Sequence, residues 1–301
     1  LSWIPKKLVQ DLWFRTVGLP KLVRSHQVDV MFFPQPATGF RRMPVRSVVN
    51  PHDIQFIEHP ERAGLVERLK TRMFYGADFR LRDWIIAISD YDRRAIEGHF
   101  AGLSGRVMRI YNPIRFPEGS GRSQSLEPPV ILAVNVGFVH KNTETLIRAF
   151  ERVADRVPHC LVLVGRLRPE TGHLATLIER SPQSHRIRLT GYLKDQELDR
   201  LYAGCDLFVT PSLYEGFGMT PVEAMGRQIP VVSSRESALP EATRELAHYY
   251  EPARDPQALA EVMCAVLADP PDRDMLRCIQ KDIRDHYDYR RIAGQYRDFF
   301  L

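Results

Sequence analysis

Apolar and polar positions in the second half of the chain predict strands and helices in alternation. Short apolar runs bounded by turn residues indicate buried strands, and apolar positions with a period near 3.6 residues indicate the helices between them. The expected strands cover residues 130–135, 160–164, 187–190, 206–210 and 230–233. The expected helices cover residues 143–157, 174–180, 195–203 and 221–227. Such strand–helix repeats predict a doubly wound parallel sheet, which binds ligands at the carboxyl ends of its strands.

The first half of the chain carries a less regular version of the same pattern. Its expected strands cover residues 28–33, 46–50, 84–89 and 107–110, and its expected helices cover residues 65–80 and 92–100. Residues 119–129 are polar and rich in turn formers, which is typical of a linker. We therefore predict an N-terminal domain over residues 1–127, a C-terminal domain over 128–285, and a last helix over 286–301 that packs back on the first domain.

The chain opens with a basic amphipathic segment, residues 3–15, where a doubly wound domain normally begins with a strand and a glycine-rich turn. We therefore expect the opening strand of the first domain to be missing from this chain or to have been processed. The segment has two interpretations. It is either a helix packed on its own domain or a contact to a membrane surface through Trp3, Trp13 and Phe14.

The composition is that of an ordinary globular protein, with 44% hydrophobic and 26% charged residues. No apolar run approaches the roughly 20 residues that a membrane-spanning helix needs. The four cysteines show no paired spacing, which favours a reduced, cytoplasmic setting over a disulfide framework or a zinc site.

The net charge of +5 is unevenly distributed along the chain. Residues 1–127 hold 20 Lys and Arg against 13 Asp and Glu, a balance of +7, whereas residues 128–301 hold 22 against 24, a balance of −2. The basic half is either a solvated surface or a face for anionic lipid or a phosphorylated acceptor. No basic stripe with interleaved aromatic residues is present in the sequence, so we do not expect nucleic acid as a partner.

Two carboxylates, Glu215 and Glu223, lie eight residues apart around a Gly-x-Gly loop that follows an apolar run. Residues 220–223, Thr-Pro-Val-Glu, have the sequence of a helix start, with an N-cap and a proline at the first helical position. Glu223 is therefore either the acid of a capping box or a ligand-binding group. Glu215 does not occupy a capping position, and an acid at the carboxyl end of a parallel strand favours chemistry. The amides of residues 216–219 are expected to form an anion site.

These residues resemble the retaining GT-B glycosyltransferases of glycosyltransferase family 4, which move a sugar from a nucleotide diphosphate sugar. The segment over residues 206–225 is similar to the Glu-x7-Glu signature of this family. Upstream, Asn50-Pro-His-Asp53 resembles its His-Asp loop, and His140-Lys-Asn142 resembles its Lys-Asn element. The resemblance implies the GT-B fold, in which two Rossmann-like, doubly wound parallel-sheet domains face a cleft.

The resemblance also implies a role for each residue that matches a family motif. Lys141 would neutralise the diphosphate as it leaves, and Glu215 would contact the transferred sugar. Glu223 would hold the ribose hydroxyls, and His52 would touch the sugar from the first domain. The remaining implied donor contacts are Gly137, Tyr192, Leu193, Gly216, Phe217, Gly218 and Met219.

One position departs from the family pattern. Many members place an arginine about five residues before the lysine of the Lys-Asn element, and this chain has Val136 there. Arg166 directly follows the next strand and its Gly165, so it could supply the missing positive charge at the same edge of the sheet. Arg166 is therefore included among the donor-binding residues as a hypothesis.

The sequence thus predicts a retaining hexosyltransferase that needs no metal ion, since it contains no Asp-x-Asp signature. The expected donor is GDP-mannose or UDP-glucose, and the resemblance of residues 52–60 to mannosyltransferases favours mannose. The acceptor would be a saccharide or a lipid-linked saccharide, and the expected location is the cytoplasm, with or without peripheral contact to the inner face of a membrane. Two alternatives stay open: a nucleotide-sugar 2-epimerase, and a nucleotide-sugar-binding module without activity.

Overall fold

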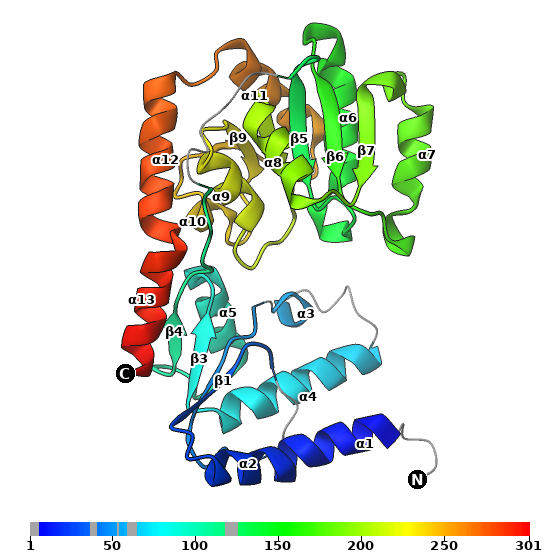
Figure 1. Cartoon of the computed structure of the whole chain (residues 1–301). Coiled ribbons are helices and arrows are strands. Elements are labelled where there is room, and N and C mark those ends of the chain that lie inside the picture. The colour runs from blue at the N-terminus through cyan, green and yellow to red at the C-terminus, as the bar shows by residue number, and fades with distance from the viewer. Residues whose placement is uncertain (1–5, 37–40, 53, 59–64, 118–125) are drawn as a thin grey trace. The chain divides into compact units, whose positions relative to one another are not determined.

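The computed structural model describes residues 6–36, 41–52, 54–58, 65–117 and 126–301 (Figure 1). The chain divides into two compact units, unit 1 over Leu1–Tyr111 with Gly294–Leu301, and unit 2 over Asn112–Ala293. The first division therefore lies before the predicted boundary at 127/128, and the second lies after the one at 285/286. Residues just after Asn112 belong to unit 2 because their contacts are there: Ile114 N donates to the Tyr287 carbonyl oxygen at 2.9 Å. Most of the predicted linker over 119–129 lies outside the described residues.

Unit 2 is built on a six-stranded parallel sheet with the order β10-β9-β8-β5-β6-β7. Its strands are β5 (Val130–Val134), β6 (Cys160–Val164), β7 (Ile187–Gly191), β8 (Leu207–Thr210), β9 (Val231–Ser234) and β10 (His248–Tyr250). The first five match the predicted strands to within one residue at each end. The chain order reverses between β5 and β8, which pair directly, so the sheet is doubly wound with a switch point at their carboxyl ends.

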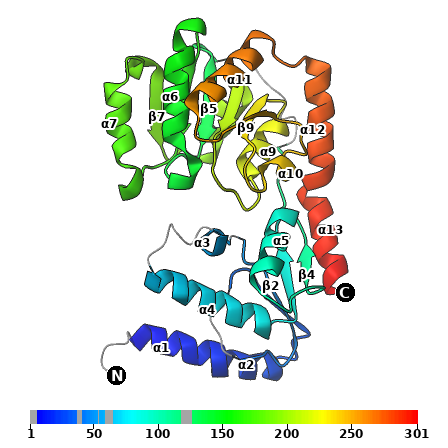
Figure 2. The same ribbon diagram turned by 180° about the vertical axis from the view of Figure 1, so that it is seen from behind.

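Helices cover both faces of this sheet, with α6, α7 and α11 on one face and α8, α9 and α10 on the other (Figures 1 and 2). They are α6 (Thr143–Val153), α7 (His173–Arg180), α8 (Asp195–Gly204), α9 (Met219–Met225), α10 (Leu239–Ala242) and α11 (Pro256–Ala268), followed by α12 (Arg273–Tyr287) and α13 (Tyr289–Phe300). The predicted helix over 143–157 is shorter than expected because the chain tightens into a 3₁₀ turn, η4 (Ala154–Arg156).

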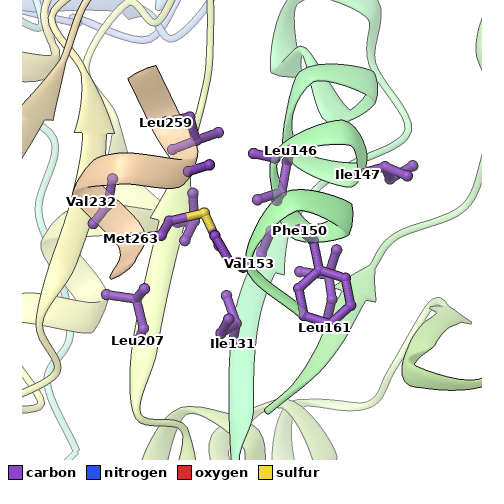
Figure 3. Packing of buried hydrophobic residues seen from close by; sticks show 14 of the residues in the cluster. Ile131, Leu146, Ile147, Phe150, Val153, Leu161, Leu207, Val232, Leu259 and Met263 are labelled. Atoms are coloured by element: carbon purple, nitrogen blue, oxygen red, sulfur yellow. The ribbon is translucent and has the colours of Figure 1, made fainter. Parts of the chain in front are cut away.

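The main core of unit 2 lies where α6 and α11 pack on the sheet. Apolar residues of α6 recur at helical spacing, and Leu146, Phe150 and Val153 are fully buried. Figure 3 shows Met263 of α11 pointing toward Val153, with Ile131 of the sheet close by. Burying each such side chain contributes roughly 1.5–3 kcal/mol. This packing gives the loops at the strand ends a rigid base.

Unit 1 contains a second parallel sheet with the order β1-β2-β3-β4. Its strands are β1 (Val30–Phe33), β2 (Arg46–Val49), β3 (Trp84–Ala87) and β4 (Val107–Arg109). Its helical segments are α1 (Lys6–Trp13), η1 (Phe14–Gly18), α2 (Leu19–Ser25), α3 (Gln55–Glu58), α4 (Leu65–Leu81) and α5 (Asp90–His99). The four described strands follow one another in chain order, so this sheet shows no reversal among them.

The amphipathic start of the chain is helical from Lys6 onward, and Trp3 lies outside the described residues. Trp13 and Phe14 are exposed on unit 1. Across the described ranges, no helix has both the length and the apolar composition to cross a membrane. The predicted contact to a membrane surface and the predicted cytoplasmic location stay predictions.

Candidate active site at a sheet edge

An ion pair joins the loops that follow β5 and β8. Lys141 ends a 3₁₀ turn, η3 (Val139–Lys141), and its Nζ lies 2.5 Å from Oε1 of Glu215. The side chains are only 12% and 13% exposed, so water and salt screen their interaction less than that of a surface pair. The pairing of β5 with β8 brings these residues together across 74 positions of sequence. The structure therefore unites two of the three residues predicted to be catalytic.

The turn that carries Lys141 is held by hydrogen bonds between the two loops. Asn142, in the left-handed region at φ 53°, donates from Nδ2 to the Pro211 carbonyl oxygen at 3.1 Å. Leu213 N donates to the His140 carbonyl oxygen at 2.7 Å. These bonds tie η3 to the segment that leads to Glu215, which limits how far the lysine can move.

Glu215 is held at both its carboxylate and its main chain. Ser212, which is fully buried, donates from Oγ to Glu215 Oε1 at 2.7 Å, and Ser234 in turn donates to the Ser212 carbonyl oxygen at 2.5 Å. The Glu215 amide donates to Ser237 Oγ at 2.7 Å. Both side-chain contacts of Glu215 within the described residues are made by Oε1, which leaves Oε2 to face a ligand.

The second acid, Glu223, does not cap a helix. α9 begins at Met219, and its N-cap is Gly218 at φ 101°, without a side-chain cap. The predicted helix start at residues 220–221 is therefore wrong, because a left-handed turn at the glycine starts the helix two residues earlier. Glu223 lies beyond the first turn, and its Oε2 accepts a hydrogen bond from the Tyr202 hydroxyl at 3.2 Å. The capping-box interpretation of Glu223 is wrong for the same reason.

Glu223 faces a cavity of about 690 Å³ within unit 2. Arg227 donates to Asp199 Oδ1 at 2.8 Å, and its guanidinium lies 4.8 Å from the centre of the Tyr202 ring. Burial raises the pKa of the Glu223 carboxyl above its ordinary value of 4.5, while Arg227 and the Tyr202 hydrogen bond oppose this rise. The cavity is lined by Arg115, Phe116, Pro117, Asp195, Leu198, Asp199, Tyr202, Glu223, Arg227, Tyr289 and Arg290.

The raised pKa of Glu223 predicts a pH-dependent effect of Glu223→Gln on stability. In the wild type the folded state binds this proton more tightly than the unfolded state, so this acid contributes less to stability as the pH rises above 4.5. Glutamine does not titrate, so the variant does not lose stability at this position as the pH rises. Its free energy of unfolding, relative to the wild type, should therefore increase between acid and neutral pH, as measured by urea unfolding followed by circular dichroism. A difference that is independent of pH would contradict the raised pKa.

The loops after β6 and β7 bring further predicted residues to the same edge of the sheet. Arg166 follows β6 and Tyr192 follows β7, and the guanidinium lies 5.8 Å from the centre of the tyrosine ring. Gly137 follows β5, and a Cβ added there would overlap the carbonyl oxygen of Arg166. Tyr192 is 70% exposed and Leu193 is half-buried. Because all these strands are parallel, their loops share one edge with the Lys141–Glu215 pair.

His52, the third residue predicted to be catalytic, lies in unit 1. It is exposed after β2 at φ 54°, and its amide donates to Asn50 Oδ1 at 3.0 Å. Asp53 of the same motif lies outside the described residues. His52 thus belongs to unit 1 and the other predicted site residues to unit 2, and its role stays a prediction.

Sequence reasoning missed the residues that hold the two acids. Ser212 follows a predicted strand, and a hydroxyl three residues before an acid is within reach of it. Tyr202 and Arg227 each lie in an expected helix, at positions that also fit packing of the helix on its sheet. Ser237 carried no signal, because its contact to Glu215 depends on how the loop after β9 folds.

Two solved structures share the fold of this chain. The sucrose-phosphate synthase of Thermosynechococcus elongatus aligns with a TM-score of 0.75 at 20% identity, over 99% of this chain and 80% of its own. Anabaena HepE, solved in complex with UDP and glucose, aligns with a TM-score of 0.73 at 20% identity, over 95% of this chain and 83% of its own. Both are GT-B glycosyltransferases, and the predicted GT-B fold is confirmed.

Sequence comparison gives relatives and a family. The chain is 31% identical over 210 residues to the serotype-specific mannosyltransferase WbdA of Escherichia coli, a match that covers 64% of this chain and 25% of WbdA. It is 34% identical over 137 residues to the O-antigen chain mannosyltransferase B of Escherichia coli, covering 45% of this chain and 36% of that protein. The chain thus spans between a quarter and about a third of these curated relatives. The family of glycosyl transferases group 1 matches residues 120–282, more than half of the sequence, and the chain belongs to this family.

Proposed function

We propose that the chain is a retaining hexosyltransferase, which moves mannose or glucose from a nucleotide diphosphate sugar to a saccharide or a lipid-linked acceptor. The observation that carries this proposal is the enclosed pair of Lys141 and Glu215 at the switch point of the unit 2 sheet. Membership of the glycosyl transferases group 1 supports the reaction class. The donor sugar, the acceptor and the retention of configuration are part of the proposal.

The opposite charges of the pair match the charges that develop during sugar transfer. The departing diphosphate gains negative charge, which Lys141 would stabilise. The anomeric carbon gains positive charge, which the free carboxylate oxygen of Glu215 would face. In the absence of donor the two side chains neutralise each other, so the site avoids an unpaired, poorly solvated charge. Donor binding would replace the contact between Lys141 and Glu215 with two others, one from Lys141 to the diphosphate and one from Glu215 to the sugar.

The cavity beside Glu223 suits the nucleoside part of the donor. Its volume of about 690 Å³ falls within the range of about 300–1,000 Å³ that is typical of small-molecule sites. Glu223 can accept hydrogen bonds from ribose hydroxyls, and Tyr202 keeps its carboxylate oriented. Arg166, with Tyr192 beside it, would add positive charge near the phosphates. We propose that Lys141 and Arg166 neutralise the diphosphate without a metal ion.

The relatives favour mannose as the transferred sugar. WbdA and the O-antigen chain mannosyltransferase B are both mannosyltransferases by name, at 31% and 34% identity. Anabaena HepE binds UDP-glucose in one of its structures, and this keeps UDP-glucose as the second candidate. GDP-mannose is therefore the donor we would test first.

A panel of nucleotide sugars would test the proposal without knowledge of the acceptor. The protein should slowly hydrolyse one donor, with GDP-mannose expected, and release the nucleoside diphosphate at an equal rate in EDTA. Proton NMR at early times should show the released sugar with the anomeric configuration of the donor. Release of a sugar epimerised at C2 would favour the epimerase, and donor binding without turnover in any acceptor screen would favour the inactive binding module.

A further inference from the structure

The loop after β9 holds the main chain of Glu215 from both sides. Ser237 lies between β9 and α10, and its Oγ accepts a hydrogen bond from the Glu215 amide at 2.7 Å. The next residue, Ala238, donates from its amide to the Glu215 carbonyl oxygen at 3.4 Å. Two consecutive residues of this loop thus form hydrogen bonds to both the amide and the carbonyl oxygen of Glu215.

Ser237 makes this contact from an unfavourable backbone conformation. Its φ is 51°, in the left-handed region, which is strained for a residue other than glycine. A glycine at this position would remove that strain, but it would also remove the hydroxyl that accepts from Glu215. Serine is therefore the residue that keeps the hydrogen bond at the expense of local strain.

We propose that Ser237 is a positioning residue for Glu215 in the transfer reaction; this inference rests on the proposed function. Ser212 holds the carboxylate of Glu215 at one end, and Ser237 holds its amide at the other. With both ends fixed, Oε1 stays on Lys141, and Oε2 would be held in one orientation for the sugar. Without Ser237, the Ser212 and Lys141 contacts would persist, but the main chain could shift.

A shift of about 1 Å at a residue that faces the reacting atoms can cost about 100-fold in rate. Ser237→Gly should therefore lower kcat by about 10- to 100-fold. KM for the donor should change less than about threefold, because Lys141 and the Glu223 cavity are untouched. The melting temperature should change little, since the strain that glycine relieves at this position offsets the loss of the hydrogen bond to the Glu215 amide. A residue with only a structural role would show the opposite pattern, a loss of stability with little change in kcat.

The experiment compares the wild-type chain with Ser237→Gly, Ser237→Ala and Gln228→Gly. Alanine removes the hydroxyl and keeps the strain, so it should lower kcat as glycine does while also lowering stability. Gln228 lies at φ 62° after α9, and Gln228→Gly relieves strain of the same kind away from Glu215. This control should keep the kcat of the wild type. A Ser237→Gly enzyme with wild-type kcat would overturn the inference and leave the proposed function intact.

A second measurement does not depend on activity. Hydrogen–deuterium exchange by NMR should show the Glu215 amide exchanging at least about 10-fold faster in Ser237→Gly than in the wild type, with no such change in Gln228→Gly. If no donor is turned over by the wild type, the proposed function fails, and the exchange rate still decides whether Ser237 anchors Glu215. Unchanged exchange at Glu215 would overturn the anchoring itself.

Discussion

Replacing Lys141 with alanine is expected to lower kcat/KM for sugar transfer by about two to three orders of magnitude, the range found when one preorganised group that stabilises developing charge is removed. The variant should also bind the nucleoside diphosphate product more weakly. Both effects have one cause, the loss of the cation that ends beside Glu215 at the switch point of the sheet. Steady-state kinetics and calorimetric titration with GDP and UDP would measure them.

Glu215→Gln should distinguish the contribution of the carboxylate from that of Lys141. Transfer should slow by a comparable factor, because a neutral amide does not stabilise positive charge at the anomeric carbon. Binding of the nucleoside diphosphate should be equal to that of the wild type or tighter, since Lys141 no longer has an internal carboxylate as its partner. The two variants thus differ in the direction of their effect on product affinity, which makes the pair of measurements sharper than either alone.

Lys281→Ala is the matched control for these two variants. Lys281 is an exposed lysine of α12 with a carboxylate partner, Asp285, at 2.7 Å, so the change removes the same charge and an ion pair of similar length. Kinetics and product affinity should stay at wild-type values. If Lys141→Ala and Glu215→Gln weakened diphosphate binding equally, the pair would hold the site together without dividing its charges between diphosphate and sugar.

Gly137→Ala is expected to destabilise unit 2 by an amount at the upper end of the roughly 1–3 kcal/mol that is typical of overpacking. The added Cβ would overlap the Arg166 carbonyl oxygen and lie 2.8 Å from its carbonyl carbon. Both atoms belong to the backbone, so the overlap cannot be relieved by a change of side-chain rotamer. The loops after β5 and β6 must therefore separate, which would also displace Arg166 from its proposed place near the phosphates.

Native-state hydrogen exchange of the β5 and β6 amides would measure this loss. Gly172→Ala supplies the control in the same unit: its φ is −58°, and the nearest atom to an added Cβ is the Pro169 carbonyl oxygen at 3.4 Å, an ordinary contact. This variant should be as stable as the wild type or slightly more stable, because alanine restricts the unfolded chain. Equal stability of Gly137→Ala and Gly172→Ala would contradict this prediction, because it would show that the loops after β5 and β6 can separate without a loss of stability.

The sheet of unit 2 was predictable because its strands are short apolar runs bounded by turn residues. β6 (Cys160–Val164) was predicted with its exact ends, since its five residues are all apolar and pack from both faces. The start of α9 was not predictable in this way. A Thr-Pro-Val-Glu sequence satisfies the rules for a helix start, but the preceding Gly218 takes a positive φ that only the folded loop reveals.

Some contacts of the candidate site were likewise predictable from the sequence, and others were not. Glu215 was named from its place at the end of a predicted parallel strand and Lys141 through the resemblance to a family, and the structure explains their meeting by the pairing of β5 with β8. Ser237 could not be named, because a serine in a loop has no periodicity and its partner lies 22 residues away. The Tyr202–Glu223 contact was hidden for a similar reason: it joins two helices whose packing depends on the whole sheet.

The strand order of unit 2 has a consequence for how specificity can change. The chain leaves the centre of the sheet after β5, builds β6 and β7 at one side, and returns to the centre with β8. Arg166, Tyr192 and Leu193 all belong to this excursion, whereas Lys141 lies in the loop directly after β5 and Glu215 in the loop after β8. A change of side chains within the excursion would therefore alter the surroundings of the proposed donor site without replacing either residue of the ion pair. The excursion thus carries only part of the proposed donor contacts, because Glu223 lies in α9, after β8.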